Sequence, residues 1–180
     1  MNISKLSKIL SLVLRHSPEA YNITLDNEGW ADIDILIEAI SLHHQEFSAI
    51  TRESILEVVN SSDKKRHEVN GDRIRALYGH SFENIIKKDI VSPPTILYHG
   101  TIYENYLKIK DTGIKKMQRQ YVHLSENIEQ AKIVAYRRTH EPIILEVKAK
   151  EAYNNGINFY KEGNVWLSED IPYVFICKII

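Results

Sequence analysis

The pattern of apolar residues changes at Val91–Thr95, and this change most constrains the fold. Before it, apolar residues recur three and four positions apart, the spacing of one helical face. After it, short apolar runs rich in Ile, Val and Tyr favour strands. The stretch itself, VSPPT, holds two prolines that stiffen the chain and end regular structure. The sequence therefore predicts an α+β protein with two domains, residues 1–92 and 93–180.

The first domain is predicted to be mainly helical. Helices are expected over residues 5–15, over 33–42 after Asp32 as N-cap, and over 52–60 after Thr51 as N-cap. Asn70-Gly71 then predicts a hairpin, since this dipeptide is a strong two-residue turn signal. Three helices followed by a hairpin describe a winged-helix-like domain.

The second domain is predicted to be a mostly antiparallel, β-rich α+β domain. Strands are expected in TILYHGT, YVHLS, PIILEVKA, NVWL and VFICKII. Helices are expected over 103–112, ended by Gly113, and over about 128–138.

Composition excludes several classes of protein. The 180 residues are 43% apolar with a formal charge of −1, so no global basic field attracts nucleic acid. Residues 1–92 carry 11 Lys/Arg and 14 Asp/Glu (−3), and residues 93–180 carry 12 and 10 (+2), so an anion site must be a local cluster. The single Cys177 excludes an internal disulfide, which suits a reducing compartment. With no signal-peptide pattern and no membrane-length apolar stretch, we expect a soluble cytoplasmic protein.

Basic residues at two places in the first domain suggest an anion site. Arg15 and His16 end the first helix before Pro18, where they either complement the helix dipole or hold an anion. A hairpin loop at Asn70-Gly71 pairs Arg66 with Arg75, which is unfavourable unless both side chains splay into water or an anion lies between them. Gly79-His80-Ser81 is either a simple turn or a close-approach segment with two donors.

The second domain offers a second group of candidates. His99 ends a strand before Gly100 and Thr101, and His123 shares one strand face with Tyr121 and Ser125. Either histidine alone is equally compatible with a structural role. Lys115, Lys116 and Arg119 would form a solvated face or would suit a pyrophosphate or an RNA backbone. Arg137 and Arg138 close a helix, and one of them can turn inward.

Taken together, these stretches resemble the RNA 2′-phosphotransferase family, the NAD-dependent enzymes that remove an internal 2′-phosphate from RNA, as in tRNA splicing. The matching stretches occur in the family's order: LSKILSLVLRHSPE, GWADIDILI, KKRHEV, IRALYGHS, LYHGT, GIKKMQRQYVHLS, EPIILEV and NVWLSEDIP. They cover nearly the whole chain.

The resemblance implies a fold, a co-substrate and residue roles. The fold is an N-terminal winged-helix-like lobe for RNA and a C-terminal ADP-ribosyltransferase-like lobe for NAD, which is consumed. The implied catalytic residues are Arg15, His16, Arg66 and Arg138, the last chosen over Arg137 by the resemblance alone. Implied NAD-binding residues are His99, Gly100, Thr101, Arg119, His123, Leu124 and Ser125, and RNA-binding residues are Arg75, Gly79, His80 and Ser81. The implied partner is a tRNA-like RNA, bound by a monomer that requires no metal.

The implied reaction has two steps. The RNA 2′-phosphate attacks NAD and releases nicotinamide, which leaves an ADP-ribosylated RNA phosphate. The neighbouring ribose hydroxyl then releases ADP-ribose 1″,2″-cyclic phosphate. The chain departs from the family pattern at Tyr78, Tyr121 and Thr139-His140-Glu141, and Val165 stands where many protein ADP-ribosyltransferases have a catalytic glutamate.

Two other functions fit the same residues. An ADP-ribosyltransferase would leave ADP-ribose stably attached to a nucleic-acid phosphate or a protein. A non-catalytic winged-helix module would bind RNA or DNA without consuming NAD, although the acidic first half argues against strong non-specific binding.

Overall fold

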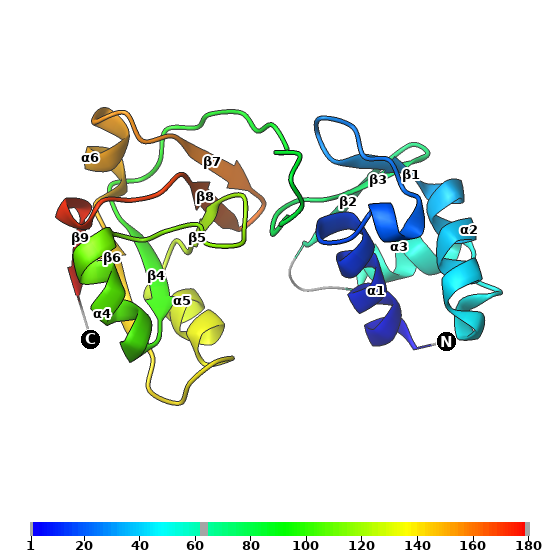
Figure 1. The fold of residues 1–180 in the computed structure, drawn as a ribbon, viewed down its shortest axis with the longest axis horizontal. Coiled ribbons are helices and arrows are strands. Elements are labelled where there is room, and N and C mark those ends of the chain that lie inside the picture. The colour runs from blue at the N-terminus through cyan, green and yellow to red at the C-terminus, as the bar shows by residue number, and fades with distance from the viewer. Residues whose placement is uncertain (1, 62–64, 179–180) are drawn as a thin grey trace. The chain divides into compact units, whose positions relative to one another are not determined.

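The structure is a computed structural model that describes residues 2–61 and 65–178, in which the chain forms two compact units, Met1–Lys87 and Lys88–Ile180 (Figure 1). Lys64 of the KKRHEV stretch and the last two residues of the strand expected at 174–180 lie outside the described residues. Each unit has its own apolar core. In the described residues, no helix is long and apolar enough to cross a membrane.

Unit 1 combines three α-helices with a small antiparallel sheet. Its elements are α1 (Ile3–Arg15), η1 (Glu19–Tyr21), β1 (Trp30–Asp32), α2 (Ile33–His43), η2 (Gln45–Phe47), α3 (Arg52–Asn60), β2 (His67–Asn70) and β3 (Arg73–Ala76). The strands lie in the order β1-β3-β2. The two predicted N-caps are confirmed: the Asp32 side chain accepts from the amides of Asp34 and Ile35, and the Thr51 side chain accepts from that of Ser54.

The core of unit 1 follows from the helical pattern of α1. Its predicted apolar face, Leu6, Ile9, Leu10, Val13 and Leu14, is buried. Helix α1 packs on α3 and β3. The opposite, polar face of α1 is therefore left for other contacts.

The hairpin register predicted from Asn70-Gly71 is wrong: the loop lies one residue later, and each cross-strand partner is therefore two residues further along the chain. The loop is Gly71-Asp72, so Glu68 pairs with Arg75 and Asn70 with Arg73. Gly71 has φ +58° at the first loop position, where a type II′ turn places glycine. The predicted Arg66–Arg75 like-charge pair therefore does not form, and Arg75 bonds Glu68 instead, Nη2 to Oε2 at 2.7 Å.

Unit 2 contains two three-stranded antiparallel sheets, ordered β4-β6-β9 and β5-β8-β7. Its elements are β4 (Leu97–Thr101), α4 (Tyr103–Thr112), β5 (Val122–Leu124), α5 (Ile128–Ala135), β6 (Ile143–Val147), α6 (Ala149–Asn154), β7 (Phe159–Glu162), β8 (Val165–Ser168), η3 (Tyr173–Phe175) and β9 (Ile176–Lys178). Helix α4 has the predicted bounds. Helix α5 is shorter than predicted, because the chain leaves the helix at Tyr136.

One pair of backbone hydrogen bonds joins the two sheets of unit 2. The amide of Tyr98 donates to the carbonyl of Ser125 at 2.9 Å, and the amide of Ser125 donates back at 2.8 Å. This bridge brings the strand that carries His99 next to the strand that carries His123. Helices and antiparallel sheets in both units agree with the predicted α+β class, whereas the winged-helix and ADP-ribosyltransferase assignments stay predictions.

Candidate functional site

The C-terminal end of α1 is held by a segment that lies far along the sequence. The amide of Ser81 donates to the carbonyl of Arg15 at 2.8 Å, and the Ser81 hydroxyl lies 2.8 Å from Nδ1 of His16. One residue of the Gly79-His80-Ser81 stretch thus fixes both residues of the Arg-His pair.

Arg15 also reaches the hairpin. Its Nη2 donates to the carbonyl of Arg66 at 3.2 Å, and the same carbonyl accepts from the amide of Leu77 at 3.0 Å. The Arg15 guanidinium lies over the Tyr78 ring, 5.2 Å from its centroid, which suits a cation–π contact. Tyr78, one of the departures from the family pattern, therefore helps to fix the guanidinium.

The pKa of the buried His67 ring is affected by two positive charges of this region. Burial, together with the smaller effects of the positive charges of Arg15 and Arg66, lowers the pKa of His67 to about 3. Both guanidinium groups therefore act electrostatically on the same point. Two arginines that act on the same ring favour an anion beside them, and arginine binds phosphate through paired hydrogen bonds.

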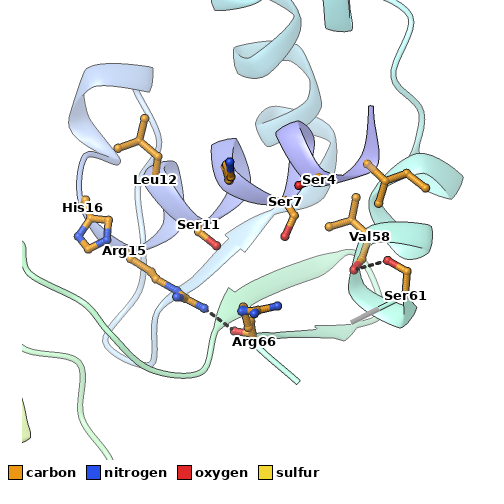
Figure 2. A pocket seen from close by; sticks show the side chains of 11 residues that line it. Ser4, Ser7, Ser11, Leu12, Arg15, His16, Val58, Ser61 and Arg66 are labelled. Atoms are coloured by element: carbon orange, nitrogen blue, oxygen red, sulfur yellow. Dashed lines mark hydrogen bonds between the residues drawn. The ribbon is translucent and has the colours of Figure 1, made fainter. Parts of the chain in front are cut away.

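A pocket of about 770 Å³ opens beside these residues (Figure 2). Figure 2 shows Arg15, Ser11 and Ser7 of α1 on the side that faces Arg66. The described residues that line it include no Asp or Glu: Ile3, Ser4, Ser7, Lys8, Ser11, Leu12, Arg15, His16, Val58, Ser61 and Arg66. The serines and Lys8 were not among the predicted site residues. Their signal was visible in the sequence, since serines three and four positions apart follow one face of the first helix.

The other predicted RNA-binding residues have different surroundings. Arg75 bonds Glu68 and lies over the Trp30 ring, 4.5 Å from its centroid. Gly79 adopts φ +92°, a conformation that glycine takes without strain. His80 is buried with its ring edge-on to Phe82. Ser81 is joined by hydrogen bonds to both Arg15 and His16.

In unit 2, the two histidines form a connected group with Arg119. Nδ1 of His99 donates to the carbonyl of His123 at 3.0 Å, and Nδ1 of His123 donates to the carbonyl of Tyr121 at 3.0 Å. Because a carbonyl can only accept, Nδ1 carries the proton in both rings. Nε2 of His123 then accepts from Nη1 of Arg119 at 3.2 Å. Burial lowers the pKa of His99, which keeps that ring neutral with Nε2 as an acceptor.

Arg138 acts on the same histidine. Its positive charge contributes to the lowered pKa of His99, after the larger effect of burial. Arg138 therefore acts electrostatically on His99. Arg138 is also the arginine that the resemblance selected over Arg137.

Gly100 explains how the helix that leads to Arg138 packs against the strand that carries His99. A Cβ atom on Gly100 would lie 2.3 Å from the carbonyl oxygen of Ala131 and 2.9 Å from Cβ of Ala135, both on α5. The missing side chain therefore lets α5 pack against β4, and the amide of Arg138 bonds the carbonyl of Ala135 at 2.9 Å, just past the end of that helix. The side chains of Thr101 and Leu124 are buried, and Ser125 forms the bridge between the sheets.

Comparison with known proteins identifies the family of this chain. Residues 2–170 match the model of the family described as "RNA 2'-phosphotransferase, Tpt1 / KptA family". The chain is similar to a probable RNA 2′-phosphotransferase of Fusobacterium nucleatum, with 46% identity over 97% of this chain and 98% of that protein. It is also similar to one of Acetivibrio thermocellus, with 42% identity over 98% of this chain and 97% of that protein. A third, from Flavobacterium johnsoniae, is 43% identical over 97% of this chain and 96% of its own length.

Proposed function

Since the chain belongs to the RNA 2′-phosphotransferase family, we propose that it removes an internal 2′-phosphate from RNA by transferring it to NAD. Membership of this family supports an enzyme that removes a 2′-phosphate from RNA. The use of NAD and the roles of individual residues are our proposal. The products are repaired RNA, nicotinamide and ADP-ribose 1″,2″-cyclic phosphate.

The pocket at the end of α1 carries this proposal. Arg15 and Arg66 both act on the buried His67, and Ser81 holds His16 beside them. None of the described residues that line the pocket is acidic. We assign Arg15, His16 and Arg66 to the RNA 2′-phosphate, whose charge matches this cluster.

The histidine group of unit 2 suits a dinucleotide. The neutral His99 ring presents Nε2 as an acceptor, which fits a ribose hydroxyl, and Arg119 offers further donors for a pyrophosphate. This donor and acceptor set is the support for NAD. We assign His99, His123 and Arg119 to holding the dinucleotide in place and Arg138 to the reacting phosphate.

The first proposed step is a substitution at the ribose carbon that carries nicotinamide. An oxygen of the RNA 2′-phosphate forms a bond to this carbon, and nicotinamide leaves with the electron pair of the broken bond. The nucleophile is already an anion and needs no general base, which is consistent with Val165 in place of a glutamate. The protein's part is to orient the two reactants.

The second proposed step is a transfer at phosphorus. The adjacent 2″-hydroxyl of the ribose attacks the phosphorus, the bond to the RNA 2′-oxygen breaks, and the hydroxyl proton ends on that oxygen. Negative charge gathers on the phosphoryl oxygens, where a guanidinium stabilises it. We therefore expect loss of Arg138 to slow this step most.

The test uses a short RNA with one internal 2′-phosphate, incubated with and without NAD in EDTA. The wild-type chain should lose the phosphate only with NAD, and should form the cyclic phosphate. Arg138→Gln should accumulate ADP-ribosylated RNA, Arg15→Gln should leave the RNA unmodified, and Arg137→Gln is the matched control that should resemble wild type.

Three outcomes would contradict parts of this proposal. Loss of the phosphate without NAD would refute the co-substrate. Stable ADP-ribosylated RNA as the wild-type end product would identify a transferase without the second step. If Arg15→Gln and Arg138→Gln stalled with the same species, the division of roles between the two arginines would be wrong.

A further inference from the structure

The pocket beside α1 is longer than a single phosphate requires. It is lined by residues from Ile3 to His16, which span the whole of the helix and its C-cap. Ser4 and Arg15 are eleven positions apart, which is about 16 Å along a helix axis. Arg15 and His16 occupy only one end of the pocket, and the rest of its length has no role in the reaction proposed above.

The remaining length is polar and basic. Ser4, Lys8, Ser11 and Arg15 are separated by four, three and four positions, so they follow one another along one face of the helix. Ser7 lies beside this row in Figure 2, and Ser61 faces it from the end of α3. Hydroxyls and an ammonium group in a line match successive oxygens of a polyanion better than a single compact ion.

Two lysines on α1 differ in their surroundings. Lys5 bonds Glu46, Nζ to Oε1 at 2.5 Å, and does not line the pocket. Lys8 is exposed, lines the pocket, and forms no ion pair with any carboxylate in residues 2–61 and 65–178. The charge of Lys5 is therefore neutralised within the protein, whereas that of Lys8 is directed at the pocket.

We propose that Lys8, with Ser4, Ser7 and Ser11, binds a backbone phosphodiester of the RNA beyond those that directly flank the nucleotide with the 2′-phosphate. This inference rests on the proposed function, because it takes Arg15 and Arg66 as the anchor of the 2′-phosphate. The described residues that line the pocket include no Phe, Tyr or Trp, and the ring of His16 is assigned above to the 2′-phosphate, so the part of the pocket beside Lys8 offers no ring on which a base could stack. The subsite contacts the backbone and is indifferent to base sequence.

The experiment measures RNA binding by fluorescence anisotropy with the full chain. The probes are a dinucleotide and a pentanucleotide, each with and without one internal 2′-phosphate, over a range of salt concentrations. Lys8→Gln should weaken binding of the pentanucleotide about two- to fivefold and lower its salt slope by about 0.7, the value for one phosphate contact on a single strand. It should leave the dinucleotide unchanged. Ser7→Ala should weaken the pentanucleotide in the same selective way.

Lys5→Gln is the matched control, because it removes the same charge from the same helix outside the pocket. Equal effects of Lys5→Gln and Lys8→Gln would overturn the inference, since the effect would then come from net charge. An equal loss for both RNA lengths would also overturn it, because Lys8 would then act on the 2′-phosphate itself. Competition by inorganic phosphate as effective as that by the pentanucleotide would show a simple ion site.

Arg15→Gln separates this inference from the proposed function. It should abolish the preference for RNA with the 2′-phosphate over the same RNA without it. If that preference survives in Arg15→Gln, the assignment of the 2′-phosphate fails, whatever Lys8 does. If the preference is lost but Lys8→Gln behaves as wild type, only the backbone subsite fails.

Discussion

Replacing Gly100 by alanine should damage the position of Arg138 more than it damages the fold. The added Cβ would lie 2.3 Å from the carbonyl oxygen of Ala131, whereas an ordinary contact of this kind is near 3.5 Å. Helix α5 must therefore retreat from β4 by about 1 Å. Overpacking of this kind costs about 1–3 kcal/mol, so most of the chain should stay folded.

The functional effect should be larger than the loss of stability suggests. Arg138 bonds Ala135 at the end of α5 and moves with that helix. A displacement of about 1 Å at a reacting group can reduce the rate about a hundredfold. We expect Gly100→Ala to accumulate ADP-ribosylated RNA, as Arg138→Gln does. The pKa of His99 should rise toward its ordinary value as the guanidinium recedes, which NMR titration measures.

Gly163→Ala is the control within the same unit. Gly163 has φ +57° and nothing within 4 Å of an added Cβ, so this change costs about 1–2 kcal/mol of backbone strain without moving α5. A second change, Ala135→Gly in the Gly100→Ala background, should restore only part of the loss, since the carbonyl of Ala131 remains. If Gly100→Ala lowered the free energy of unfolding but left the pKa of His99 and the second step as in Gly163→Ala, the reasoning would be refuted.

Two further predictions concern stability. The pKa of His67 is about 3 in the folded chain and near 6.5 in the unfolded chain, so the unfolded chain binds an extra proton between these two pH values. The free energy of unfolding should therefore fall as the pH drops from 6.5 toward 3, by up to about 1.4 kcal/mol per pH unit. His67→Gln should make this acid dependence shallower in urea titrations, and an unchanged slope would assign it to other groups. Lys88 and Glu162 form a buried ion pair in unit 2, Nζ to Oε1 at 2.6 Å, so Glu162→Gln should cost about 3–5 kcal/mol by leaving the lysine charge buried. Exposed Glu129→Gln is the comparison, and an equal change in urea midpoint for both would contradict a special role for the pair.

Local signals predicted those parts of the fold that depend on local interactions. The first residues of α2 and α3, after Asp32 and Thr51, were predictable because each N-cap side chain bonds amides two or three residues away. Helix α6 and strand β7 were not predicted, since α6 has six residues and no side-chain cap. The hairpin register failed because Asn70-Gly71 signals a tight turn but not which residue of the pair opens the loop.

The candidate site shows the same division between local and distant effects. Arg15, His16 and Arg66 were recognisable as unusual basic residues, but the joint effect of Arg15 and Arg66 on His67 depends on a hairpin 51 positions from the helix end. Nothing local in the sequence shows that α5 packs closely on Gly100. The atoms that a Cβ atom at this position would contact belong to residues 31 and 35 positions later.

The attachment of Ser81 to the end of α1 has a consequence for the order of folding. Helix α1 is held by contacts within its own turns and can form as soon as those residues exist. The partners of Arg15 and His16 lie 51 and 65 positions away, and such distant contacts close late because more chain must be ordered first. A nascent chain that ends before Ser81 therefore has the helices of unit 1 but an incomplete phosphate-binding site. RNA should be bound only after unit 1 has been synthesised and folded.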